Sequence, residues 1–216
     1  MINELTLQSI PFGNKIIELY VPDPNYMKAR YEEETDADSK TPFPYWSQIW
    51  SSAIALAQFI EEQPHYIQDK KVLELAAGLG LPSLVAAKVA KEVFCTDYLP
   101  ETIAVLEKSV AYNKIENISC KLLDWNEINP TFSTADVVLM SDVNYNPTDF
   151  ETLFQVFKNF LSAGATIILS TPQRLMAKSF VEQLMPWCKL KEEIDVHQQN
   201  SMIPITILVL KLATAE

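Results

Sequence analysis

Two of the chain's four glycines, Gly78 and Gly80, fall together in a short stretch between an apolar segment and a helix-like segment. Because glycine has no side chain, the backbone of such a turn lets a ligand approach closely, and the amino end of the next helix offers free N–H groups. Glycines at this spacing also occur in turns that are merely tight. The turn therefore predicts a ligand site only where other residues support it.

Asp97 gives that support. It stands at the end of the next apolar segment, about twenty residues after the glycines, where a carboxylate can accept both hydroxyls of a ribose. Its alternative role is that of an exposed acid or a helix cap, since Pro100 and Glu101 follow. With the glycine turn upstream, we favour the ribose role.

Two nucleotide cofactors suit this arrangement, a nicotinamide dinucleotide and S-adenosylmethionine. A dinucleotide site prefers a third glycine or alanine to admit the pyrophosphate, and Ser83 stands at that position instead. The carboxylate of Glu74 is poorly placed against a pyrophosphate but suits the positively charged methionine portion of S-adenosylmethionine. Its alternative role, capping nearby backbone N–H groups, is compatible with that function. These residues favour S-adenosylmethionine.

The elements that position these residues follow from the hydrophobic pattern. Short apolar runs predict strands, and apolar residues three and four apart predict helices. Strands are expected as two short segments within 4–21, and then at 71–75, 93–96, 118–123, 135–140, 165–169, 190–196 and 203–212. Helices are expected at 50–63, 81–90, 103–110, 150–161 and 177–187.

Strands that alternate with helices imply a mostly parallel sheet with helices on both faces, and the short gap before the final strand implies an antiparallel hairpin. The expected fold class is α/β, doubly wound and Rossmann-like, with a mostly parallel seven-stranded sheet, an antiparallel last strand and a short N-terminal β extension. Residues 1–41 are expected to form a β-hairpin and a solvated acidic connector, and residues 42–216 the single large domain.

The stretch from Glu74 to Pro82, with Asp97, Asp124-Trp125 and Asp142 to Tyr145, resembles the class I seven-β-strand methyltransferases. More narrowly, it resembles methyltransferase family 16, the branch that contains many protein-lysine methyltransferases. That branch carries a tryptophan before the glycine turn, matched here within Ile49 to Ala53. The resemblance covers most of the chain, and four motifs in the right order are more specific than any one of them.

The resemblance implies a cofactor role for each matched residue. Glu74, Gly78 and Gly80 would line the methionine end of S-adenosylmethionine, and Asp97 would hold the ribose. Asp124 would accept from the adenine amino group, with Trp125 near the ring and Trp50 closing over the cofactor; both tryptophans have core packing as the alternative. The expected cofactor-binding set is Trp50, Glu74, Ala76, Gly78, Gly80, Asp97, Tyr98, Asp124, Trp125 and Ser141.

Asp142 and Tyr145 are the expected catalytic residues. They follow the fourth strand of the domain, beside the topological switch point where ligands bind, and a carboxylate and a phenol there can orient an amine and take up its proton. The alternative is that Asp142 caps a loop and Tyr145 packs beneath it. The aromatic cluster of Phe43, Tyr45 and Trp46 has two interpretations, an acceptor rim or core.

One residue departs from the family pattern. Ala76 stands where relatives usually have glycine, so a Cβ occupies a place that is often empty. If the backbone there needs a positive φ, cofactor affinity is expected to suffer.

Composition excludes several other classes. A formal charge of −11 argues against a general nucleic-acid binder, but allows a small molecule or a basic region of a partner protein. Three scattered cysteines indicate reduced thiols, and two histidines without ligand spacing predict no metal site. The first residues lack a signal-peptide pattern, and no apolar run is long enough to span a membrane, so we expect a cytoplasmic protein without membrane partners.

The expected function is S-adenosylmethionine-dependent transfer of a methyl group to an amine acceptor, with a protein lysine favoured by the resemblance. A small-molecule amine stays open, because one scaffold serves many acceptors. Two readings from other classes also stay open, a nicotinamide-dependent oxidoreductase and a non-catalytic binding domain that kept the fold.

Overall fold

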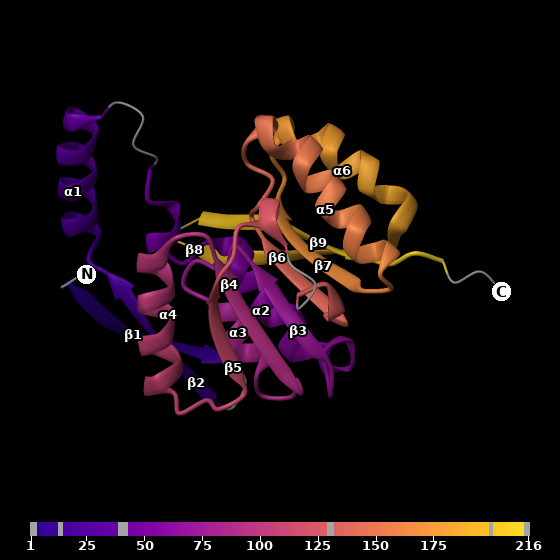
Figure 1. The fold of residues 1–216 in the computed structure, drawn as a ribbon, viewed down its shortest axis with the longest axis horizontal. Helices are drawn as coiled ribbons and strands as arrows, with labels where there is room; N and C mark the ends of the chain where they lie inside the picture. The colour runs from indigo at the N-terminus through magenta and orange to yellow at the C-terminus, as the bar shows by residue number, and fades with distance from the viewer. Residues whose placement is uncertain (1–3, 13–14, 39–42, 129–131, 199–200, 214–216) are drawn as a thin grey trace.

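The computed structural model describes residues 4–12, 15–38, 43–128, 132–198 and 201–213. The strands of these residues form two sheets, one with two strands and one with seven (Figure 1). The strands are β1 (Leu5–Phe12), β2 (Lys15–Pro22), β3 (Lys71–Leu75), β4 (Glu92–Asp97), β5 (Ile118–Leu122), β6 (Val137–Ser141), β7 (Thr166–Pro172), β8 (Cys188–Gln198) and β9 (Ser201–Leu210). The α-helices are α1 (Pro24–Ala37), α2 (Ser51–Glu62), α3 (Leu81–Ala86), α4 (Pro100–Tyr112), α5 (Phe150–Ser162) and α6 (Lys178–Leu184).

The large sheet has the strand order β5-β4-β3-β6-β7-β9-β8. Its strands from β5 to β7 run parallel, whereas β9 is antiparallel to both β7 and β8. The chain order reverses between β3 and β6, so the carboxyl ends of these two strands flank a crevice where ligands bind in open α/β sheets. The predicted doubly wound sheet with its reversed last strand is confirmed.

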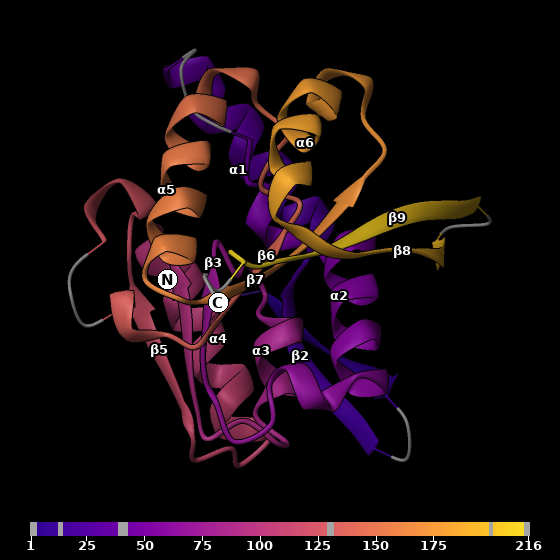
Figure 2. The ribbon, with the colours of Figure 1, turned by 90° about the vertical axis from the view of Figure 1, so that its right-hand side faces the viewer.

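Helices cover both faces of the sheet (Figure 2). One hydrophobic core joins α2 and α3 to the sheet, and a second core lies beneath α5 and α6. Strands β3 and β6 contribute to both cores, because successive side chains of a strand point to opposite faces. Their continuous burial explains why these strands appear in the sequence as unbroken apolar runs.

The predicted N-terminal hairpin is present as β1 and β2, which pair along their full lengths. It packs on α4: Ser109 Oγ accepts the N–H of Tyr20, and Asn113 exchanges hydrogen bonds with the backbone of Glu18. Leu19 is fully buried in the same core as α2 and α3. The hairpin therefore extends the helical layer on that face.

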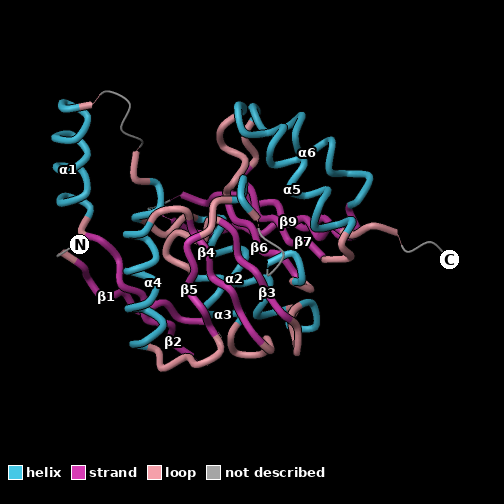
Figure 3. The backbone as a smooth tube through the Cα atoms, in the orientation of Figure 1, coloured by secondary structure: helices cyan, strands magenta, loops and turns pink. Residues whose placement is uncertain are grey.

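The described part of the expected acidic connector is mostly exposed, and it is helical, because α1 continues to Ala37. The helix is capped by Asp23, whose carboxylate accepts the N–H groups of Asn25 and Tyr26. The sequence pattern does not reveal this helix, because Met27 is its one buried residue and its apolar periodicity is weak. Residues 39–41 of the predicted connector lie outside the described part of the chain. Figure 3 shows α1 at one end of the molecule, with α5 and α6 toward the other.

Candidate functional site

A cleft of about 540 Å³ opens at the carboxyl ends of β3, β4 and β6, the size of a site for a small ligand. The glycine turn after β3 forms one part of it, and the segments after β4, β6 and β7 form others. Helix α1 and the segment from Phe43 to Trp50 line it as well. The predicted residues in its wall are Trp50, Ala76, Gly78, Gly80, Asp97, Tyr98, Trp125, Ser141, Asp142 and Tyr145.

The two glycines of the turn have different structural reasons. Both have positive φ, +53° at Gly78 and +71° at Gly80. A Cβ on Gly78 would meet nothing closer than 3.5 Å, so it is the backbone conformation, and not the available space, that favours glycine there. A Cβ on Gly80 would lie 2.4 Å from Leu106 Cδ2 and 3.0 Å from Cys95 Sγ. Gly80 is therefore also needed for the packing of α4 against the sheet.

Ala76 has φ +52°, the left-handed backbone conformation that glycine adopts more readily than alanine. An L-residue with a Cβ holds this conformation at a cost of roughly 1–2 kcal/mol. The neighbouring Ala77 has no such angle and is buried.

We predict that Ala76→Gly raises the free energy of unfolding by roughly 0.5–1 kcal/mol, because relief of the strained angle exceeds the extra chain entropy of glycine. Urea denaturation measures the effect. Ala77→Gly is the matched control and should be destabilising, since Ala77 is buried at an ordinary angle. Equal destabilisation by both substitutions would contradict the assignment of strain to Ala76.

Glu74 lies beneath the turn, fully buried, and is absent from the described wall of the cleft. Its Oε2 accepts the backbone N–H of Ser83 at 2.9 Å and the Ser83 hydroxyl at 2.5 Å. Its Oε1 is buried without a hydrogen-bond partner in the described structure. Burial raises the pKa of Glu74 to about 8, although the Ser83 contacts act in the opposite direction. The capping role is thus the one that the geometry shows, and a contact with the methionine end stays a prediction.

The raised pKa of Glu74 makes stability depend on pH. The folded state binds the proton more tightly than the unfolded state, where the pKa is near 4.5, so this contribution declines as pH rises from about 4.5 to about 8. Glu74→Gln mimics the protonated acid and removes the titration. We expect the difference in unfolding free energy between Glu74→Gln and wild type to grow in favour of glutamine across this range in urea titrations. A difference independent of pH would contradict the burial effect.

Asp97 faces the cleft from the end of β4. Its Oδ2 accepts the N–H of Gly78 at 3.0 Å, and its Oδ1 accepts the N–H of Leu99 at 3.1 Å. Burial raises the pKa of Asp97, and these backbone donors oppose the shift. A carboxylate has about four acceptor positions, so Asp97 can tie the glycine turn to its own loop and still accept a ligand hydroxyl.

The predicted adenine side is only partly brought to the cleft. Trp125 and Tyr98 line it, and burial raises the pKa of the Tyr98 phenol. Asp124 is exposed and is not among the described lining residues. Its Oδ1 accepts from the backbone and side-chain amides of Asn126, as a cap for the short turn at Trp125. Its contact with adenine stays a prediction.

Asp142 and Tyr145 follow β6 and both face the cleft. Asp142 has φ +56°, and its N–H donates to the carbonyl of Ser170 on β7. Burial raises the pKa of the Tyr145 phenol, with nearby Tyr98 and acidic groups adding to the effect, so the phenol keeps its proton at neutral pH. Tyr145 is 42 % exposed, which rules out packing beneath the loop.

Sequence reasoning missed Arg174, which lies in the loop after β7. Its guanidinium binds both carboxylate oxygens of Asp142, with Nη2 at 3.0 Å from Oδ2 and Nη1 bound to Oδ1. Arg174 also lines the cleft. No motif includes it, so the sequence offered no signal beyond an arginine after the fifth strand of the domain.

An aromatic rim, which we define as Phe43, Tyr45, Trp50 and Tyr145, borders the cleft. The ring centroid of Tyr45 lies 4.9 Å from Phe43, 6.1 Å from Trp50 and 5.3 Å from Tyr145. Trp50 Nε1 donates to the Tyr45 carbonyl at 2.7 Å, which fixes the two residues together. Trp50 precedes α2 rather than lying on its face. Of the three aromatic residues with two interpretations, Phe43 and Tyr45 are exposed at the cleft, whereas Trp46 is buried.

Two other properties can be stated for the described residues. They contain no group of three or more histidine, cysteine, aspartate or glutamate side chains placed to hold a metal ion. None of their helices is both long enough and apolar enough to cross a membrane.

Comparison with known proteins agrees with this geometry. PH1948 of Pyrococcus horikoshii, described as a candidate RNA methyltransferase, has a solved structure that superposes with a TM-score of 0.60 at 20 % identity, covering 87 % of this chain and 98 % of that one. The fold is therefore that of the class I methyltransferases. The sequence model of a lysine methyltransferase family matches residues 39–187, and the chain belongs to that family.

Two curated relatives are named for different acceptor residues. The histone-arginine methyltransferase METTL23 of Xenopus laevis is 33 % identical over 114 residues, which are 50 % of this chain and 49 % of the relative. The protein N-lysine methyltransferase METTL21A of Xenopus tropicalis is 30 % identical over 129 residues, which are 58 % of this chain and 60 % of the relative. The matches thus span about half of the length of these relatives.

Proposed function

We propose that this chain binds S-adenosylmethionine in the cleft and transfers its methyl group to the side-chain amine of a protein lysine. The observation that carries the proposal is the meeting of the glycine turn, Asp97, Asp142 and Tyr145 in one cleft of a chain that belongs to the lysine methyltransferase family. The donor set suits this cofactor. Asp97 has acceptor capacity for a ribose, and the buried unpartnered oxygen of Glu74 suits a nearby positive charge.

In this proposal the chain's residues bind, orient and exclude water. When bound, the cofactor supplies an electrophilic methyl group. Asp142 would attract the cationic acceptor, and its carboxylate would take up the acceptor's proton, directly or through water. The Tyr145 phenol keeps its own proton and would help to hold the acceptor nitrogen toward the methyl group. The aromatic rim contacts the acceptor's aliphatic chain and its charge.

A protein arginine is the second candidate acceptor. Asp142 already binds one guanidinium through both oxygens, which shows that its carboxylate can hold a planar fork. METTL23, a relative that matches half of this chain, is named for arginine methylation. The two candidates differ in the product, methyllysine or methylarginine.

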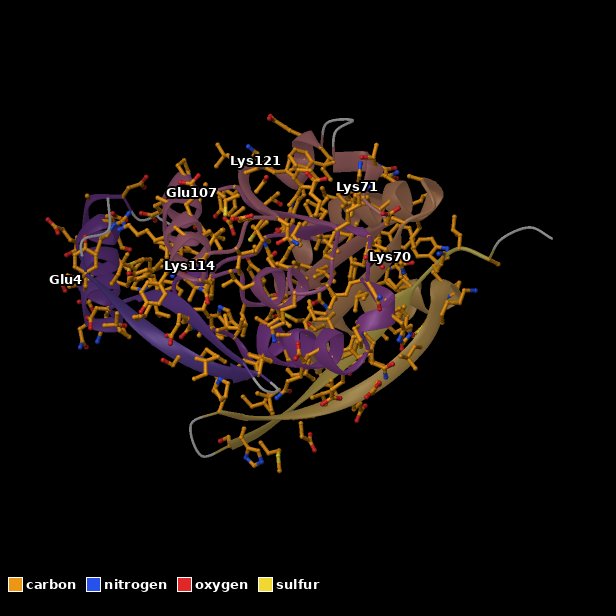
Figure 4. The ribbon with its side chains drawn as sticks, turned by 90° about the horizontal axis from the view of Figure 1, so that it is seen from below. Glu4, Lys70, Lys71, Glu107, Lys114 and Lys121 are labelled. Carbon is orange, nitrogen blue, oxygen red and sulfur yellow. The ribbon has the colours of Figure 1, made fainter. Side chains whose placement is uncertain are left out.

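The chain's charge supports a protein acceptor over a nucleic acid. The net charge is −11, whereas a general nucleic-acid binder needs a basic surface. Lys70 and Lys114 precede β3 and β5, at the amino ends of the strands and so opposite the cleft; both are labelled in the view from below (Figure 4).

The chain's three free cysteines fit a reducing compartment, so we propose that the protein acts in the cytoplasm.

Labelled methyl transfer tests the proposal. The chain is incubated with S-adenosylmethionine labelled in its methyl group and cell lysate, with and without protease, and labelled protein is hydrolysed to amino acids. Label in methyllysine is expected, and label in methylarginine would select the second candidate. Label confined to small molecules would overturn a protein acceptor. Calorimetry with NADH is the control, and NADH binding without S-adenosylmethionine binding would overturn the cofactor.

A further inference from the structure

Among the carboxylates that line the described cleft, Asp142 has a partner unlike the others. Asp97 accepts backbone N–H groups, and Glu34 and Glu101 each contact Arg30 of α1 through one oxygen at 2.6 Å. Asp142 is instead bound through both of its oxygens, by Arg174. A guanidinium is planar and presents its donors in a rigid fork, so this contact fixes the rotation of the carboxylate as well as its position.

The backbone on both sides of the pair is also held. Asp142 keeps its left-handed conformation while its N–H donates to the Ser170 carbonyl, which ties it to β7. Arg174 donates its own N–H to the Pro172 carbonyl at 2.8 Å and accepts the N–H of Ala177 at 3.0 Å. Both partners thus stand on the ends of neighbouring parallel strands, β6 and β7. A non-glycine residue in a costly conformation is found where the surrounding structure enforces it, commonly at functional sites.

We propose that Arg174 is a positioning residue for the reaction, holding the Asp142 carboxylate in the orientation that aligns the acceptor nitrogen. This inference rests on the proposed function. Each carboxylate oxygen has two acceptor positions, and the guanidinium uses one on each. The guanidinium therefore fixes the direction in which the remaining acceptor positions point. Tyr145 lies three residues after Asp142 in the same loop. Arg174 acts through Asp142 and does not itself take up the proton.

The contact between Arg174 and Asp142 has a consequence for kinetics. Without Arg174 the carboxylate is still present but rotates, so the acceptor binds with its nitrogen misaligned. Misplacement of a reacting group by about 1 Å can cost on the order of 100-fold in rate. The loss should therefore fall on kcat more than on the KM for the acceptor, and it should disappear once Asp142 itself is gone.

The test is a double-mutant cycle with Arg174→Met, Asp142→Asn and the double variant, measured as kcat and KM for methyl transfer to the lysate protein that the labelling experiment above identifies. We expect Arg174→Met to lower kcat about 10- to 100-fold, with KM changed less, and to have no further effect in the Asp142→Asn background. Arg174→Lys, which keeps the charge but not the fork, should recover part of kcat. Lys178→Met is the control, because it removes a cation four residues further along the chain that pairs with exposed Glu182 in the described structure.

Several outcomes would overturn the inference. One is a kcat of Arg174→Met equal to that of wild type, and another is a loss that multiplies in the double variant, as a general structural defect would. If Arg174→Met fails to fold or to bind S-adenosylhomocysteine, the cycle is run with Arg174→Lys, and a wild-type kcat there overturns the inference. Wild-type protein that transfers no methyl group to any acceptor overturns the proposed function, and this inference with it.

Discussion

Asp142→Ala is expected to lower kcat for methyl transfer by about 10³-fold or more while the affinity for S-adenosylmethionine stays within about twofold. The carboxylate faces the cleft beside Tyr145 and is the group there that can attract and align a cationic nitrogen. It touches no part of the glycine turn or the Asp97 loop in the described hydrogen bonds, so the cofactor side should be preserved. Single-turnover kinetics and calorimetry measure the two quantities.

Asp149→Ala is the matched control for this substitution. Asp149 lies in the loop after β6, outside the described cleft wall, and accepts from Asn146 and Thr148. Its removal should leave kcat close to that of wild type. Full turnover by Asp142→Ala would remove Asp142 from the mechanism, and loss of cofactor binding in that variant would show that it supports the fold of the cleft instead.

Gly80→Ala is expected to lower the free energy of unfolding by roughly 3 kcal/mol. The added Cβ would lie 2.4 Å from Leu106 Cδ2 and 3.0 Å from Cys95 Sγ, and both side chains are buried, so the packing of α4 on β4 must shift. The residue also has φ +71°, which alanine adopts at a cost. Equilibrium urea unfolding measures the change.

Gly164→Ala separates the two causes. Gly164 has φ +90° and no atom within 4 Å of an added Cβ, so it should show the conformational cost alone, about 1 kcal/mol. Leu106→Ala in the Gly80→Ala background makes room for the new methyl group, so the double variant should lose less than the sum of the single losses. A Gly80→Ala effect no larger than that of Gly164→Ala would contradict the packing role.

The parts of the site that could be predicted from sequence are those fixed by local pattern and chain order. The switch point can be predicted from the apolar runs at β3 and β6 and from the glycines between β3 and α3. Asp97 and Asp142 can be predicted from their places at the ends of strands. Arg174 could not be found in this way, because it meets Asp142 across 32 residues and through the pairing of β6 with β7. That contact depends on the register of β6 against β7, which a sequence motif does not specify.

Other differences have local causes. Helix α1 buries too little apolar surface for its period to stand out, and its stability is helped by a cap at Asp23 and by the bridge of Arg30 to Glu34 and Glu101. Glu74 lies beneath the turn rather than in the wall of the cleft because of the face of β3 from which its side chain points. The sequence does not reveal that face, since a strand buried on both sides lacks the alternation of apolar and polar residues.

The insertion of β9 between β7 and β8 bears on how the protein acquires its fold during synthesis. Strands β3 to β7 form one continuous parallel block, but the outer edge of β7 receives its partner only when residues 201–210 have left the ribosome. Until then a strand of almost entirely buried residues has an open edge, which is a template for wrong pairing. Nascent chains that stall before β9 should therefore depend on chaperones, although every residue of the cleft wall has already been made.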